Sequence, residues 1–130
     1  MPTSLRKPLV YSDLTHKIIG ALFSVFNNIG HGHKESFYQK GFARELEVIA
    51  LTFKEQLPAR ISYKGKSIGI YYFDFLIEDK IILEIKVRNF FSKKDIEQLY
   101  SYLKAKNLKL GLIAHFTKSG VKFKRIVNIN

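Results

Sequence analysis

Apolar residues recur at helical spacing in three segments of the chain. The first helix is expected over residues 14–29, because an apolar stripe returns there every three or four positions. Ser12 and Asp13 are typical N-cap residues before it, and Gly30 is typical of a helix end. The stripe contains Leu14, Ile18, Leu22, Val25, Phe26 and Ile29.

Two more helices are predicted by the same spacing. One covers about residues 34–49, with Phe37, Phe42, Leu46 and Ile49 on its buried side. The other covers "SKKDIEQLYSYLKAKN", in which Ser92 and Asp95 have the spacing of a capping box. Its apolar stripe contains Ile96, Leu99 and Leu103.

Strand-like patterns fill the remaining segments. Residues 52–87 form a strand meander with turns at 64–66 and 78–80, and Pro58 predicts an edge strand or an interruption. Two further strands, around a turn at residues 118–120, follow the last helix. The order predicts one α+β or α/β domain over residues 12–130, after a lead-in at residues 1–11.

The strand pair around the turn at 78–80 contains unexpected charges. Side chains alternate between the two faces of a strand, so Phe73, Phe75 and Ile77 should share the core face with the odd-numbered residues of the second strand. A three-residue loop satisfies this parity and places Asp74 opposite Glu84, with Cβ atoms about 5 Å apart. Lys86, Asp74 and Glu84 should then lie on the opposite face.

Opposed carboxylates repel each other, so a cation is expected beside them. Lys86 can serve as that cation in a structural ion pair. Mg²⁺ or Mn²⁺ is the other solution, because hard divalent ions bind carboxylate oxygens together with substrate phosphates. The spacing of Asp74 and Glu84 is compatible with both interpretations.

Charge narrows the classes of partner. The chain has 22 Lys and Arg residues against 11 acidic residues, a net charge of +11. Such an excess suits binding to nucleic acid or to an anionic membrane surface. A soluble domain with a lysine-rich surface and no such partner would have the same composition. The absence of cysteine excludes disulfides and thiolate chemistry. The sequence has neither a secretory signal pattern nor a membrane-length apolar run, so a cytoplasmic protein with no membrane partner is expected.

Three motifs together resemble a known family. Asp74 and Glu84-Ile85-Lys86 have the form D-x9-E-x-K, residues 32–38 read G-x-x-E-x-x-Y, and residues 98–102 read Q-x-x-x-Y. Their order is similar to that of the GxxExxY proteins in the RecB-like branch of the PD-(D/E)XK nuclease superfamily. The resemblance spans residues 14–129, with Phe73 where the superfamily has proline.

The resemblance implies a restriction-endonuclease-like core. In this fold a central mixed sheet is flanked by helices in αβββαβ order, here with an extra N-terminal helix. It also implies a catalytic set of Glu35, Asp74, Glu84 and Lys86. Asp74, Glu84 and Glu35 would be the ligands of Mg²⁺ or Mn²⁺.

Further residues are expected around this set. Tyr38 is predicted to be a packing residue whose hydroxyl reaches a polar group of the site. Gln98 and Tyr102 would orient Lys86, a water or the bound strand, or would simply border the core. The exposed lysines predicted to contact nucleic acid are Lys34, Lys93 and Lys94.

The function implied is hydrolysis of DNA phosphodiester bonds by a metal-dependent endo- or exonuclease. DNA is favoured over RNA, structure-selective cleavage is an open option, and dimerisation is an analogy with junction-resolving relatives. The alternative is a catalytically silent module on the same fold, which binds nucleic acid or a protein partner.

Overall fold

The computed structural model describes residues 10–129, so the predicted lead-in lies outside the described residues except for its last two. The described part contains three helices and five strands. Their order is α1 (Ser12–Ile29), α2 (Glu35–Val48), β1 (Phe53–Tyr63), β2 (Lys66–Ile77), β3 (Ile81–Lys86), α3 (Lys93–Lys106), β4 (Leu110–Thr117) and β5 (Gly120–Val127).

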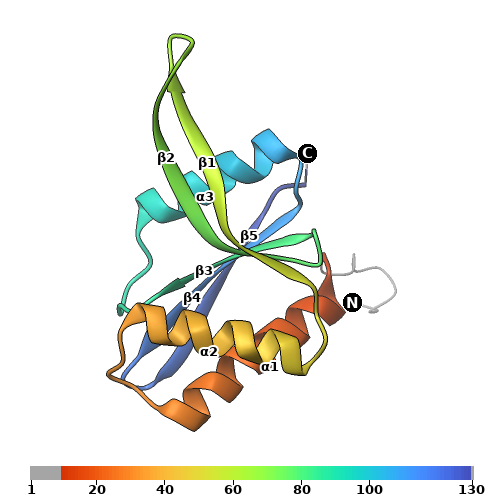
Figure 1. Ribbon diagram of the computed structural model, residues 1–130, viewed down its shortest axis with the longest axis vertical. Helices are drawn as coiled ribbons and strands as arrows, with labels where there is room; N and C mark the ends of the chain where they lie inside the picture. The colour runs from red at the N-terminus through yellow and green to blue at the C-terminus, as the bar shows by residue number, and fades with distance from the viewer. Residues whose placement is uncertain (1–9, 130) are drawn as a thin grey trace, which may run out of the picture.

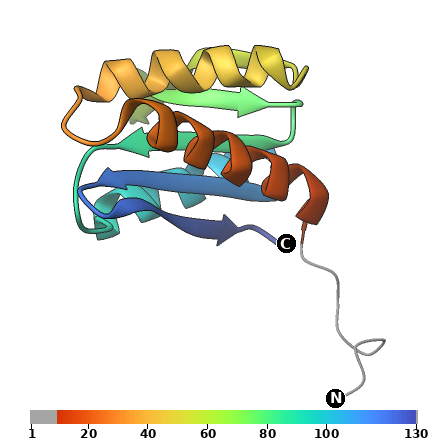
Figure 2. The ribbon, with the colours of Figure 1, turned by 90° about the horizontal axis from the view of Figure 1, so that it is seen from below.

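The strands form one mixed sheet in the order β1-β2-β3-β4-β5. All neighbours are antiparallel except β3 and β4, which are parallel because α3 connects them as a crossover. Helices α1 and α2 cover one face and α3 covers the other (Figures 1 and 2). This arrangement confirms the predicted α+β fold. Among residues 10–129, no helix is long and apolar enough to cross a membrane.

Each face of the sheet has its own hydrophobic core. The α1 and α2 side packs Ile18, Leu22 and Phe42 against strand residues such as Leu83. The α3 side is smaller, and it depends on a close approach between helix and sheet. A Cβ on Gly111 of β4 would lie 2.7 Å from a methyl group of Leu99, so glycine lets α3 approach the strand this closely.

The predicted register of β2 and β3 is confirmed. Ile77 pairs with Ile81 across the three-residue loop, and Phe75 pairs with Leu83. The ladder ends at that pair, although β3 continues beside β4 as far as Lys86. Beyond Phe75, β2 turns away with β1 (Figure 1). We call this separation of β2 from β3 the fork.

The prediction that Phe73 shares a face with Phe75 is wrong. Phe75 lies in the α1 and α2 core, whereas Phe73 packs on the α3 side, against Tyr102. The strands are irregular here: Gln56 of β1, between the partners of Phe75 and Phe73, has a left-handed φ of 53° and is absent from the β1–β2 ladder. The resulting change of direction turns Phe73 toward α3.

Among the predictions about single residues, some are confirmed and others are wrong. Pro58 lies in the edge strand β1, as predicted. Of the predicted capping box, Ser92 Oγ caps α3 by accepting from the Asp95 N–H, whereas the Asp95 carboxylate pairs with Arg88. Helix α1, however, already begins at Ser12 and has no side-chain cap. On α2 the buried side includes Tyr38, whereas Phe37 is 49% exposed. The buried face of α2 is therefore rotated from the predicted one.

Candidate functional site

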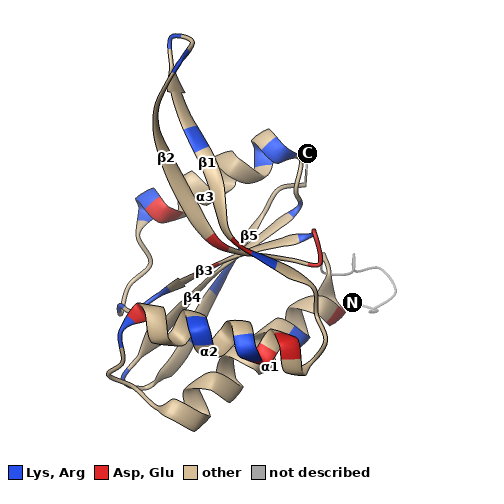
Figure 3. Cartoon of the chain, in the orientation of Figure 1, with Lys and Arg blue, Asp and Glu red and all other residues tan. Residues whose placement is uncertain are grey.

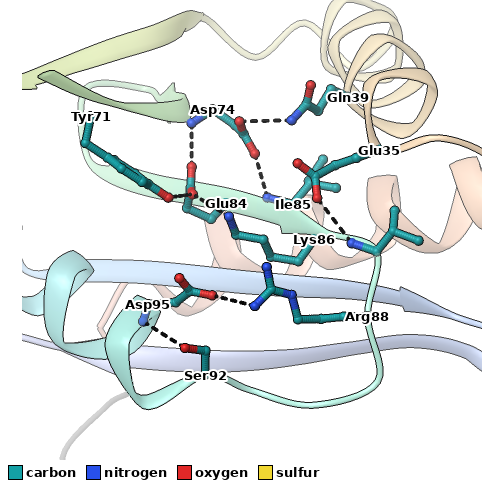
Figure 4. Close-up of polar contacts among 11 residues, drawn as sticks. Glu35, Gln39, Tyr71, Asp74, Glu84, Ile85, Lys86, Arg88, Ser92 and Asp95 are labelled. Atoms are coloured by element: carbon teal, nitrogen blue, oxygen red, sulfur yellow. Dashed lines mark hydrogen bonds and ion pairs between the residues drawn. The ribbon is translucent and has the colours of Figure 1, made fainter.

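Two carboxylates complete the hydrogen bonding at the fork. The Asp74 N–H donates to Glu84 Oε1 over 2.7 Å, and the Ile85 N–H donates to Asp74 Oδ2 over 2.8 Å (Figure 4). Where the strands separate, these N–H groups lose the carbonyls of a neighbouring strand, and a buried N–H requires another acceptor. Each acidic side chain therefore replaces a missing ladder partner and is held in a fixed place.

The other two carboxylate oxygens also have partners. Gln39 Nε2 of α2 donates to Asp74 Oδ1 over 3.0 Å. The Tyr71 hydroxyl donates to Glu84 Oε2 over 2.7 Å, and Lys86 Nζ lies 3.7 Å from the same oxygen. All four oxygens of the pair are thus oriented by neighbours on α2, β2 and β3.

The electrostatic balance at the fork is incomplete. Asp74 is 8% exposed and Glu84 4%. Burial raises the pKa of Asp74, and the negative charge of Glu35 raises it further. The hydrogen bond from the Ile85 N–H acts in the opposite direction and lowers this pKa. Burial and the charge of Asp74 raise the pKa of Glu84 to about 7. One ammonium therefore does not compensate two buried carboxylates, and the pair favours a proton or a further cation.

Glu35 approaches from the first turn of α2. Its Oε1 accepts a hydrogen bond from the Val87 N–H over 3.3 Å, just beyond the end of β3. The structure therefore brings Glu35, Asp74, Glu84 and Lys86 together around the fork, from two strands and a helix (Figure 4). Their roles in chemistry remain predictions.

Tyr38 is a packing residue, but its hydroxyl does not reach the carboxylates. It donates to the Gly30 carbonyl over 2.6 Å, and the ring stacks on Phe116 with centroids 4.1 Å apart. Tyr38 thereby fixes the loop between α1 and α2. That loop leads into Glu35 at the start of α2, so Tyr38 helps to hold the backbone that carries Glu35.

The motif residues of α3 lie beside the fork. Tyr102 packs its ring on Phe73 with centroids 4.7 Å apart, and burial raises its pKa. Gln98 is half-buried one turn earlier and makes no side-chain hydrogen bond with another residue in the described range 10–129. In this structure both residues border the α3-side core, and neither contacts Lys86 through a hydrogen bond.

Sequence reasoning missed four polar residues at or near the site. They are Gln39, Tyr71, Arg88 and Asp95, of which the last two form an ion pair at 3.2 Å (Figure 4). Gln39 follows Glu35 by four positions on the helix, so a search for i, i+4 neighbours would have found it. Tyr71 had no such signal, because its contact depends on the bend in β2.

Lysines flank the site at two helix ends. Lys34 immediately precedes α2, and Lys93 and Lys94 begin α3 (Figure 3). All three side chains are exposed, and Lys93 forms an ion pair with Glu97 at 3.8 Å. They place cations at the first turns of both α2 and α3.

A cavity of about 540 Å³ opens next to the contact between Glu35 and Val87. The α1–α2 loop and the segments after β3 and β4 enclose it. Aromatic rings lie among its walls and cations on its border, a combination suited to part of a nucleotide. Its lining includes His31, Tyr38, Arg88, Phe116, Lys118 and Ser119.

The donor chemistry at the fork fits a hard divalent ion. Carboxylate oxygens are the ligands that Mg²⁺ and Mn²⁺ prefer, and a cation would relieve the repulsion that raises the pKa of Glu84. Within residues 10–129, however, no three His, Cys, Asp or Glu side chains are arranged to hold a metal ion. Glu35 lies near enough for its charge to raise the pKa of Asp74, and its role as a third ligand stays a prediction; Asp74 and Glu84 would share the ion with substrate or water.

Comparison with known proteins adds a family and a fold. A model of the PD-(D/E)XK nuclease superfamily matches residues 12–126. A solved structure, "Crystal structure of SSO0001", is similar over 90% of this chain and 58% of that one, with a TM-score of 0.52 and 17% identity. At that identity the likeness shows the fold alone, and this chain spans less than two thirds of the other. No curated protein matches the chain.

Proposed function

Because the chain belongs to the PD-(D/E)XK nuclease superfamily, we propose that it is a metal-dependent nuclease that hydrolyses DNA phosphodiester bonds. The observation that supports this most directly is the fork, where Asp74 and Glu84 share buried charge beside Lys86. The motifs at residues 32–38 and 98–102 further suggest the GxxExxY group of the RecB-like branch. Residues 12–130 would form the nuclease domain.

Asp74 and Glu84 would hold Mg²⁺ or Mn²⁺, the ions that this superfamily generally uses. When bound, the ion polarises the scissile phosphate and lowers the pKa of an attacking water. The protein's part is to keep the two carboxylates in place. Gln39 and the Ile85 N–H orient Asp74, while Tyr71 and the Asp74 N–H orient Glu84. Preorganised groups of this kind avoid reorganisation during the reaction.

Lys86 would stabilise charge on the phosphate or position the attacking water. Its ammonium lies 3.7 Å from Glu84 Oε2, and its side chain is only 15% exposed, so its charge is little screened by solvent. Glu35, at the outer end of the site, would orient a water close to Asp74. Lys34, Lys93 and Lys94 would hold the DNA backbone on both sides, with specificity for DNA structure rather than for sequence.

Cleavage assays test this function directly. Linear, nicked, flapped and branched DNA, with matched RNA, would be incubated with Mg²⁺ or Mn²⁺ and wild-type, Asp74→Ala or Glu84→Ala protein. We expect metal-dependent cleavage of DNA by wild type alone. Sedimentation of the active species would show whether two copies act together on a duplex. Failure to cut any substrate, or equal cutting by both variants, contradicts the proposal.

One observation favours a second function, a catalytically silent nucleic-acid-binding module. Each oxygen of Asp74 and Glu84 already has an internal partner, and residues 10–129 contain no preformed three-ligand metal group. Calorimetric titration with Mn²⁺ distinguishes the two. Metal uptake that requires both carboxylates supports the nuclease, whereas tight DNA binding without metal uptake supports the module. Weak DNA binding would instead favour a protein partner.

A further inference from the structure

The outer part of the β1–β2 hairpin projects from the sheet as a two-stranded ribbon (Figure 1). We call residues 60–70 the arm. β1 is an edge strand, and the pairing of β2 with β3 ends at Phe75, so within the described residues the arm has no third strand. Every residue from Arg60 to Ile68 is exposed. A ribbon this bare buries little apolar surface of its own.

The arm nevertheless carries large apolar side chains. Tyr63 is 61% exposed and Ile68 66%, and Ile61 and Ile70 are also exposed. Single exposed apolar residues are ordinary, but a concentration of them on one projecting segment is typical of a binding surface. The arm therefore needs an occupant that can cover both faces of a thin ribbon.

Charge indicates the chemistry of that occupant. Arg60, Lys64 and Lys66 belong to the arm, and two of them lie at its tip (Figure 3). The sequence contains no acidic residue between Glu55 and Asp74. The arm is thus purely cationic, which complements a polyanion and disfavours a second copy of this basic chain.

Continuity with the fork links the arm to the site. β2 runs without interruption from Lys66 through Tyr71, which contacts Glu84, to Asp74. Lys66 precedes Asp74 by eight positions, and at about 3.3 Å per residue the tip lies at most ~26 Å from the carboxylates. At ~3.4 Å per nucleotide, this is the length of roughly eight base pairs.

We propose that the arm binds B-form duplex DNA beside the catalytic site, with the ribbon in the major groove. A two-stranded ribbon fits that groove, whereas the major groove of A-form RNA is too narrow. Arg60, Lys64 and Lys66 contact phosphates along the groove, and Tyr63 and Ile68 contact its floor. This inference rests on the proposed nuclease function and specifies its substrate as duplex DNA that extends past the cleavage point.

Two matched triple variants test the arm. One is Arg60→Gln, Lys64→Gln and Lys66→Gln. The control removes equal charge from Lys54, Lys80 and Lys109, all →Gln. These exposed residues lie near the start of β1, at the end of the β2–β3 loop and just before β4, away from the arm. Fluorescence anisotropy with a labelled duplex of about 30 base pairs would measure affinity without divalent ions over a range of salt concentrations.

We expect the arm triple to bind the duplex at least ~10-fold more weakly than the control, with a salt slope smaller by about 2 to 3. Tyr63→Ser with Ile68→Ser should weaken duplex binding without changing that slope. All these side chains are exposed, so the thermal unfolding midpoint should be unchanged. Equal losses in the two triples, or an equal loss of single-stranded and duplex binding in the arm triple, overturns the proposal.

The same proteins separate this inference from the nuclease proposal. Arm-dependent duplex binding by a wild type that cuts no DNA with Mg²⁺ or Mn²⁺ refutes the nuclease and supports the arm. Metal-dependent cleavage with equal duplex affinity in both triples supports the nuclease and refutes the arm. Affinity and cleavage thus report on different residues.

Discussion

The two ends of β2 differ in pairing and in burial. From Phe75 to Ile77 the strand is paired on both sides, by β1 and β3, and it is almost wholly buried. From Lys66 to Ile70 it is paired with β1 alone and lies in solvent. A single strand therefore joins a rigid centre, which can hold side chains in fixed geometry, to a free ribbon, which can reach a large ligand.

Charge differs between the halves as sharply as burial does. At the fork, which borders the inner half, Asp74 of β2 and Glu84 of β3 place two carboxylates against one ammonium. The outer half carries Lys66, and the arm to which it belongs has two more cations and no carboxylate. Buried like charges are costly and are kept where chemistry needs them, whereas exposed cations cost little and attract a polyanion over a distance. Changes at the inner half should therefore have large effects, and changes at the outer half small ones.

The largest effect is expected from Asp74→Asn. An amide oxygen can still accept from the Ile85 N–H, so the fork stays intact, but a metal ligand is lost. Cleavage should fall by about 10³-fold. Without divalent ions the free energy of unfolding should rise above neutral pH, because one of two buried like charges is gone. Kinetics and denaturant unfolding measure the two effects.

Asp79→Asn is the matched control for that variant, since Asp79 is an exposed carboxylate in the β2–β3 loop. Its surface ion pair with Lys54 should contribute less than about 1 kcal/mol. Unchanged cleavage is expected. If Asp79→Asn lost as much activity as Asp74→Asn, the special role of the fork would be refuted.

The next effect is a dependence of stability on pH that a divalent ion reverses. The pKa of Glu84 is raised from 4.5 to about 7, so the folded protein keeps a proton that the unfolded chain has already released in this range. This contribution to stability is complete below pH 4.5 and is lost as the pH rises through about 7, by roughly 3 kcal/mol. Asp74 shifts in the same direction.

Thermal unfolding between acidic and slightly alkaline pH measures this loss. With a chelator present, the contribution of the pair should fall across that range, whereas Mg²⁺ should restore stability at the alkaline end by binding the charged carboxylates. In Asp74→Asn both the pH dependence and the response to Mg²⁺ should shrink. A response to Mg²⁺ that is unchanged in that variant would place the ion elsewhere.

Tyr71→Phe should have an intermediate effect. It removes the hydroxyl that donates to Glu84 Oε2 and lowers the pKa of Glu84, so that pKa should rise further. Cleavage near neutral pH should fall about 10-fold, and the rising limb of the pH–rate profile should move to higher pH. Tyr72→Phe is the control, because Tyr72 is the neighbouring tyrosine on β2 and its side chain is half-exposed. An unmoved profile in Tyr71→Phe would contradict this account.

The smallest effect is expected in the arm turn. Gly65 has a φ of 81°, a left-handed conformation that alanine adopts with strain, so Gly65→Ala should cost about 1 kcal/mol or slightly more in free energy of unfolding. Gly69→Ala is the control, since its Cβ would meet nothing within 4 Å and its φ is not left-handed. A calorimetric comparison would resolve them. A far larger loss in Gly65→Ala would mean that the arm is part of the folded core.

Sequence patterns predicted the inner half of β2 better than its outer half. Parity and the loop at residues 78–80 predicted the register, because a one-residue slip would move the whole apolar set to the wrong face. The convergence of Glu35 with the β2–β3 pair followed only from the family motifs. Alternation of residue types could not predict the fork, since strands keep the same pattern whether or not they stay paired.

The missed contacts have a common physical cause. Gln39 and Tyr71 reach the carboxylates through the placement of α2 and the bend of β2, which are tertiary features. The same bend made the prediction for Phe73 wrong. The arm was also not predicted, because exposed residues such as Ile61 and Ile68 are of a type that is equally common in the core of a sheet. In each case the outcome depends on which elements pack around the residue and not on the type of the residue.

The two edge strands of the sheet carry residues that oppose pairing with other molecules. β1 and β5 are the two edges of the sheet, and unpaired edges invite strands from other molecules. Pro58 lacks an N–H for such pairing on β1, and Arg60 follows it, while Lys122 and Lys124 lie on β5. Sheets of two copies would meet with like charges at either edge.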